Sequence, residues 1–155
     1  MIKSILIIPL AILILFSSSA FATTTRAQIN VKSSIGEPGV ASKITRIIKL
    51  TQVDNMFLPN EIWVTQGETI SFVVKNGGDH RHEMLIGTEK DLKNAAKMRR
   101  MFPDKDHSEP GLIQLESGEQ KEIIWHFDQA GTVEFACPLP GHSKGMHGII
   151  YVEKK

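Results

Sequence analysis

The sequence predicts an all-β domain, a sandwich or barrel of about seven or eight strands with one inserted helix. Three observations support this fold class. Short runs rich in Ile, Val, Phe, Trp and Thr recur along the chain, which is typical of strands. Turns that contain glycine separate these runs at the spacing found in β-sandwiches and barrels. One segment instead carries its apolar residues at helical spacing, which indicates a helix between two strands.

The first 22 residues have the three parts of a secretory signal peptide. Lys3 supplies the positive start, residues 5–16 are apolar, and Ala20-Phe21-Ala22 matches a cleavage motif. The apolar stretch is shorter than the ~20 residues that span a membrane. We therefore expect cleavage after residue 22, a periplasmic location and no stable membrane insertion of the remaining chain. An uncleaved anchor is the alternative.

Charge and cysteine content exclude several kinds of protein. The chain has 18 Lys and Arg against 17 Asp and Glu and no block of like charge. This balance argues against nucleic-acid binding and against a basic membrane-binding arm. The single cysteine, Cys137, cannot form an internal disulfide in an oxidising compartment. It is therefore a buried bystander, an intermolecular thiol or a ligand. We expect a monomer.

The chain after residue 22 divides into an arm and a domain. Residues 23–43 are polar and contain Gly36 and Pro38, which predicts a flexible N-terminal arm with at most an edge strand at 28–33. Residues 44–155 are predicted to form one domain. Its expected strands are Ile44–Val53, Glu61–Gln66, Thr69–Lys75, His82–Ile86, Ile113–Leu115, Lys121–Phe127, Thr132–Ala136 and Gly148–Val152.

The inserted helix is predicted over residues 89–102. Thr88 is followed three residues later by Asp91, the pattern of an N-cap with a capping box. Pro103 ends the pattern, since proline cannot continue a helix. The residues at helical spacing are Leu92, Ala95, Ala96, Arg99 and Phe102.

The stretch Phe135–Gly148 places three residues of metal-binding type on one short loop: Cys137, His142 and Met146. Thiolate, imidazole and thioether form a soft ligand set, which suits copper better than magnesium, calcium or manganese. Cys137 has the same parity as Val133 in the preceding strand, so its thiol is expected on the core side and shielded from water. The loop then supplies part of a metal site.

A trigonal copper site needs a second imidazole, and His82 is the best candidate. It begins the predicted strand 82–86, directly after a glycine-rich turn at 76–79. His80 is the competing candidate, but it belongs to the turn and would be harder to hold rigidly. Zinc also accepts one cysteine and two histidines. The thioether of Met146 favours copper over zinc.

These residues resemble the cupredoxins, the blue copper proteins that include azurin, plastocyanin and auracyanin. The order Cys-x4-His-x3-Met carries the resemblance, which covers about residues 35–153. More narrowly, the chain is similar to a periplasmic cupredoxin group associated with copper tolerance. The similar segments are Met56–Pro59, Gln66–Thr69, His82–Thr88, the methionine-containing helix, and Phe135–Cys137 with Pro140–His142. The resemblance implies a Greek-key cupredoxin sandwich or barrel.

The resemblance also implies one type 1 copper ion. His82, Cys137 and His142 would be its equatorial ligands and Met146 a weak axial one. The backbone N–H groups of Glu83 and Leu139 would donate to the sulfur and tune the reduction potential. Two departures bear on the site. Glu83 stands where azurin and plastocyanin carry Asn, and the His–Met spacer is shorter than that of plastocyanin.

Two functions fit this site. We expect a carrier that transfers one electron through Cu(I) and Cu(II) between periplasmic proteins; the alternative is a copper-tolerance protein that binds, buffers or delivers periplasmic copper. Its partner would be a redox protein or a copper-handling protein. We expect no enzyme, because the copper enzymes of this fold generally combine several domains. Met98 and Met101 share a helix face, and with His107 they would form a second, weaker Cu(I) site or else serve only in packing.

Overall fold

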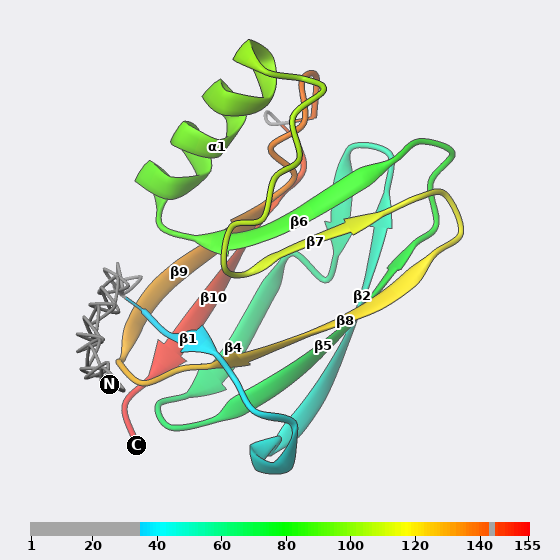
Figure 1. Ribbon diagram of the computed structural model, residues 1–155. Coiled ribbons are helices and arrows are strands. Elements are labelled where there is room, and N and C mark those ends of the chain that lie inside the picture. Colours follow the sequence, from blue (N-terminus) through cyan, green and yellow to red (C-terminus); the bar gives the residue numbers. More distant parts are fainter. Residues whose placement is uncertain (1–34, 143–144) are drawn as a thin grey trace, which may run out of the picture. The chain divides into compact units, whose positions relative to one another are not determined.

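The structure, a computed structural model, describes residues 35–142 and 145–155, which form two five-stranded β-sheets and one α-helix (Figure 1). Residues 1–34 lie outside the described residues. The predicted signal peptide and the strand expected at 28–33 therefore also lie outside them. Among the described residues, no helix has the length and apolar character that crossing a membrane requires.

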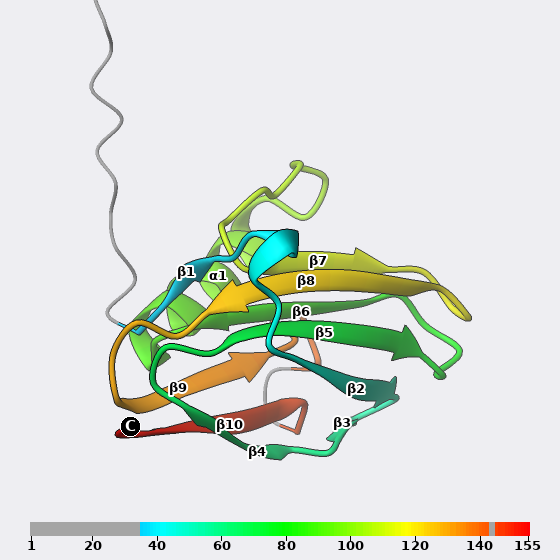
Figure 2. The same ribbon diagram turned by 90° about the horizontal axis from the view of Figure 1, so that it is seen from below.

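The first sheet has the strand order β1-β8-β5-β2-β3. Its strands are β1 (Glu37–Pro38), β8 (Gln120–His126), β5 (Thr69–Asn76), β2 (Arg46–Val53) and β3 (Met56–Leu58). β2 and β5 run parallel, and the other neighbours are antiparallel. Figure 2 shows β1 beside β8 at one edge and β3 following β2 at the other.

The second sheet has the strand order β4-β10-β9-β6-β7. Its strands are β4 (Glu61–Thr65), β10 (His147–Glu153), β9 (Gly131–Ala136), β6 (His82–Gly87) and β7 (Leu112–Leu115). β4 and β10 run parallel and the other neighbours antiparallel. The chain passes repeatedly from one sheet to the other: β1, β2 and β3 lie in the first sheet, and β4 in the second is followed by β5 in the first.

The prediction of an all-β sandwich with one inserted helix is confirmed. All eight predicted strands are present, with ends that shift by two residues at most. Two short strands, β1 and β3, add to them. β1 contains Pro38, which has no N–H to donate and is tolerated only at a sheet edge. β3 spans three residues, which is too few for an alternating pattern to stand out.

The described part of the predicted arm, residues 35–43, contributes to the sandwich. β1 pairs with β8 through Glu37 and His126, and the short 3-10 helix η1 (Ala41–Lys43) follows it. The indole N–H of Trp125 donates to the Ile35 carbonyl at 3.4 Å. The boundary predicted at residue 44 therefore does not mark the start of ordered pairing, although the division into arm and domain stays a prediction.

The core has two parts that meet at β6. The main cluster lies between the sheets and includes Phe72, Trp125 and Phe135, each at most 1% exposed. A smaller cluster, including Leu85 and Leu92, lies between the outer face of β6 and the helix α1 (Glu89–Met101). Every residue of β6 is buried as a result. A strand covered on both faces is a rigid support for the residue at its start, His82.

The helix prediction is confirmed. α1 ends one residue before the predicted end, and the capping box is formed: the Thr88 hydroxyl accepts from the Asp91 N–H, and the Asp91 carboxylate accepts from the Thr88 N–H. Its apolar face covers β6 and β9. One charged residue, Arg99, is buried on that face, with a side chain only 2% exposed.

Candidate metal centre

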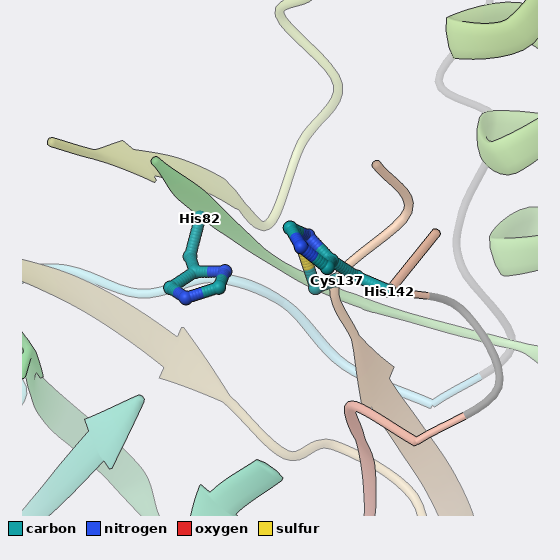
Figure 3. A group of neighbouring side chains, drawn as sticks. All are labelled: His82, Cys137 and His142. Atoms are coloured by element: carbon teal, nitrogen blue, oxygen red, sulfur yellow. The ribbon is translucent and has the colours of Figure 1, made fainter. Parts of the chain in front are cut away.

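Three side chains of metal-binding type converge at one end of the sandwich: His82, Cys137 and His142 (Figure 3). Their ligand atoms all lie within 4.8 Å of one another. The Cys137 Sγ is 3.7 Å from His142 Nδ1. Two ligands that bind one metal ion at about 2.0 and 2.3 Å with trigonal geometry are themselves about 3.7 Å apart. The spacing therefore fits a shared metal ion.

Strand register brings His82 and Cys137 together. β6 and β9 are antiparallel neighbours, and Leu85 pairs with Ala136. Cys137 follows directly after β9, so it lies beside the first residues of β6. The backbone N–H of Glu83 donates to the Cys137 Sγ at 3.4 Å. The site is thus fixed by the pairing of two central strands rather than by a mobile loop.

Backbone hydrogen bonds close the loop that carries His142. The Cys137 N–H donates to the Met146 carbonyl at 2.9 Å, and the Met146 N–H donates to the His142 carbonyl at 3.0 Å. The His142 N–H donates to the Leu139 carbonyl at 3.1 Å. Gly141 has φ +89°, a conformation that costs glycine little. These contacts return His142 to the sulfur, as the sequence predicts.

Met146 is fully buried in the main core and tied by its backbone to two of the three clustered residues. This places it next to the cluster from the side of the core. Its role as a weak axial ligand stays a prediction.

The hydrogen bonding of His82 leaves one ring nitrogen free for a metal. Its Nε2 is 2.9 Å from the Oδ1 of Asp54. This hydrogen bond lowers the pKa of Asp54, so the group is a carboxylate and can only accept. Nε2 therefore carries the proton, and Nδ1 presents a lone pair. Within the described residues Nδ1 is buried and has no hydrogen-bond partner. A buried lone pair without a partner is costly unless a ligand binds there.

The Cys137 thiol is fully buried, and burial raises its pKa. The backbone N–H of Glu83, which donates to the sulfur at 3.4 Å, acts in the opposite direction, and so does the backbone of Leu139. The donor predicted at Glu83 is confirmed, whereas the donor role of Leu139 stays a prediction. Because the raised pKa keeps the sulfur a thiol at neutral pH, a thiolate there needs a cation to stabilise it. A metal ion supplies that cation.

His142 is half-buried, and its pKa is lowered by burial first and then by the neighbouring His82 and His80. A lowered pKa keeps the imidazole neutral at physiological pH, which is the form that binds metals. One buried sulfur and two imidazoles fit a copper ion, and the residues present match the donor set of a trigonal copper site.

His80 lies outside the cluster. Its side chain is 73% exposed, and its Nδ1 is 3.5 Å from the Asp54 Oδ1. Of the two candidates, His82 is the one that the structure brings to Cys137. The second site suggested by Met98, Met101 and His107 stays a prediction. Among the described residues, the three clustered side chains are the only group of His, Cys or acidic residues close enough to share a metal.

The side chain of Glu83 forms its ion pair with the helix α1. Its carboxylate is 1% exposed and accepts from Arg99 Nε of α1 at 2.9 Å and from Gln114 Nε2 at 3.0 Å. Arg99 also pairs with Glu109. The residue whose N–H donates to the sulfur is thus held by a buried ion pair.

Sequence reasoning missed two of these residues, for different reasons. Asp54 lies in a turn, where Asp is common whatever its contacts, so nothing in the sequence marked it. Arg99 could have been noticed, because it occupies a core-facing position of the helical pattern. A charged residue there indicates a buried partner.

Comparison with known proteins agrees with this geometry. Residues 47–153 match the family described as copper binding proteins, plastocyanin/azurin family. The copper-resistant cuproprotein CopI of Rubrivivax gelatinosus is 43% identical over 119 residues, which cover 76% of this chain and 72% of that protein. CopI of Vibrio cholerae serotype O1 is 28% identical over 114 residues, covering 72% and 68% of the two chains.

Solved structures share the fold. Auracyanin B has a TM-score of 0.64 at 16% identity, over 76% of this chain and 95% of that one. Auracyanin A of Chloroflexus aurantiacus has a TM-score of 0.57 at 24% identity, over 69% and 98% of the chains. An azurin of Methylomonas sp. strain J has a TM-score of 0.54 at 16% identity, over 70% and 98%. At these identities the likeness concerns the fold alone.

Proposed function

The chain belongs to the plastocyanin/azurin family of copper-binding proteins, and we propose that it acts in copper tolerance by holding one copper ion between His82, Cys137, His142 and Met146. The observation that carries the site is the buried Nδ1 of His82, which has no hydrogen-bond partner among the described residues. It stands beside the convergence of His82, Cys137 and His142, whose ligand atoms lie within 4.8 Å of one another. Copper supplies a one-electron couple when it is bound.

Each residue has a distinct part in this proposal. Cys137 provides a thiolate in a site that water does not reach, and His82 provides a lone pair fixed by the contact with Asp54. Met146 closes the site from the core side. His142 is the one of the four that solvent reaches, since the other three are fully buried. Copper would therefore enter and leave past His142.

The relatives favour tolerance over electron transfer. Those at 43% and 28% identity are both named copper-resistant cuproproteins, and the first is matched over most of both chains. The likeness to auracyanin and azurin concerns the fold and does not separate the two functions. We therefore place the tolerance role first, although the sequence alone favoured electron transfer.

Electron transfer is the second candidate, and the rigidity of the site favours it. Backbone hydrogen bonds hold Cys137, His142 and Met146 in place, and β6 is buried on both faces. Ligands that are held in this way do not have to rearrange when copper changes its oxidation state. The partner would then be a redox protein that binds near His142, instead of a copper-handling protein.

The site of action would be the periplasm. The N-terminal sequence has the pattern of a cleaved export signal, and periplasmic copper is the cargo that a tolerance protein would bind. We propose that the exported chain acts as a monomer by binding copper and not by catalysis.

Deletion of the gene separates the two candidates. We expect the deletion strain to grow poorly on raised copper, and a plasmid copy of the wild type to restore growth while a Cys137→Ala copy does not. Respiration at trace copper should remain normal. Full copper resistance together with impaired respiration would reject the tolerance role in favour of electron transfer.

A further inference from the structure

We propose that Asp54 is a positioning residue for the metal centre: its carboxylate selects the tautomer of His82 and holds the ring so that Nδ1 faces Cys137. The inference rests on the proposed copper-binding role of His82. Asp54 lies in the turn between β2 and β3, 28 positions from His82 in the sequence.

The carboxylate of Asp54 is itself held in place. Its Oδ1 accepts from His82 Nε2 at 2.9 Å, and its Oδ2 accepts from the backbone N–H of Asp79 at 3.4 Å. The Nδ1 of His80 is 3.5 Å from Oδ1. The side chain of Asp54 is 37% exposed. It therefore joins the fully buried ring of His82 to the surface of the molecule.

A glycine provides the space in which the carboxylate and the ring meet. A Cβ at Gly78 would collide with Asp54 Oδ1 and come within 3.0 Å of His82 Nε2. The backbone at this position is fixed on both sides. The Gly78 N–H donates to Asn76 Oδ1 at 2.9 Å, and its carbonyl accepts from the Ser117 hydroxyl at 2.7 Å. Any larger residue at this position would displace the carboxylate.

The chemistry of this contact follows from what a carboxylate can do. It accepts hydrogen bonds and does not donate them, so it selects the tautomer with the proton on Nε2. Nδ1 is then the basic nitrogen, aimed at the cluster. A carboxylate on the far nitrogen also raises the basicity of a ligating imidazole, and loss of such a partner typically costs 10–100-fold in metal affinity. Cu(II), as the harder ion, should gain more from this than Cu(I).

The matched variants are Asp54→Ala and Asp79→Ala. Both remove one acid from the same surface, but only the first removes the partner of His82, because Asp79 contributes its backbone N–H. Asp54→Asn adds a third test, since it keeps an acceptor oxygen without the charge. The exposure of Asp54 means that none of these changes leaves a buried charge unpaired.

The first readout needs no copper. In the metal-free protein, nitrogen NMR of the His82 ring should show the Nε2–H tautomer in the wild type and in Asp79→Ala. Asp54→Ala should show a mixture of tautomers. A ring that keeps the pure Nε2–H tautomer in Asp54→Ala would overturn the proposal, because something other than the carboxylate would then select it.

The second readout is copper affinity, measured by chelator competition. We expect Asp54→Ala to bind Cu(II) about tenfold or more weakly than Asp79→Ala. A tenfold loss of Cu(II) relative to Cu(I) affinity raises the reduction potential by about 59 mV. Equal Cu(II) affinity in the two variants would also overturn the proposal. If the wild type fails to bind copper, the proposed function fails, and the NMR result alone decides the role of Asp54.

Discussion

At the scale of single residues, we expect Cys137 to set how copper binding depends on pH. Burial raises the pKa of its thiol, so the metal-free protein carries the proton at neutral pH. A copper ion held by Cys137 would bind the thiolate and displace that proton. Below the raised pKa, each unit by which the pH falls therefore weakens apparent Cu(II) affinity about tenfold. The imidazole of His142 adds little, because its pKa is lowered and the ring is already neutral.

Chelator competition between about pH 6 and pH 8 measures this slope, and calorimetry in two buffers of different ionisation enthalpy counts the released protons. We expect about one proton per copper ion. An affinity that does not change over this range would mean that Cys137 is ionised before copper arrives, contrary to its burial.

Residue types and spacing were enough to identify most of the cluster. Cys137 and His142 follow from the loop, and His82 follows from its place at the start of a strand; the structure brings these three together. Asp54 could not be found in this way. Its contact with His82 depends on how a turn folds back over the end of the sheet, and sequence periodicity carries no information on that.

At the scale of elements, the ion pair between Arg99 and Glu83 joins α1 to the strand that begins the site. Both side chains are at most 2% exposed. Arg99→Met would leave the carboxylate of Glu83 buried without this cation. Breaking a buried pair in this way typically costs about 3–5 kcal/mol. We expect a loss of unfolding free energy of this order in urea titrations of the metal-free protein.

Lys93→Ala is the matched control on the same helix. Lys93 pairs with Glu89, but both side chains are exposed, and exposed pairs contribute little. Its unfolding curve should overlay that of the wild type. Glu83→Gln combined with Arg99→Met should recover part of the lost stability, because the fully buried position 83 then carries no charge. If Arg99→Met were no less stable than Lys93→Ala, α1 would not depend on this pair.

The elements themselves were largely predictable, and the exceptions have physical reasons. Long alternating runs such as β5, and the capping box of α1, reflect local chemistry that the sequence displays directly. β1 and β3 are short and gain their order from pairing with β8 and β2. Their formation depends on neighbours that are distant in sequence, which local propensity does not encode.

At the scale of the whole molecule, the sandwich gathers residues from distant segments at one end. Asp54 comes from the β2–β3 turn, His82 from the start of β6, and Cys137 and His142 from the segment after β9. The helix lies on the outer face of β6 and β9, the two strands whose ends carry His82 and Cys137. Of the three clustered side chains, only His142 reaches solvent in this arrangement.

The fold and the cluster of His82, Cys137 and His142 could be predicted as a family resemblance, whereas the biological role could not. The four predicted ligands fit a carrier and a tolerance protein alike, because a motif of ligands says only that copper is held. What differs is the partner that meets His142 and the relative affinity for the two oxidation states. Those depend on surface shape and on contacts such as that of Asp54, which a ligand motif does not contain.

The visible absorption of the copper-loaded protein tests the central claim most directly. Residues 23–155, loaded with one equivalent of Cu(II), should show an intense sulfur-to-copper charge-transfer band. Cys137→Ala should lose that band completely while keeping the β-sheet circular dichroism of the wild type. A wild-type copper adduct without colour, or an unchanged band in Cys137→Ala, would contradict a copper centre built on Cys137.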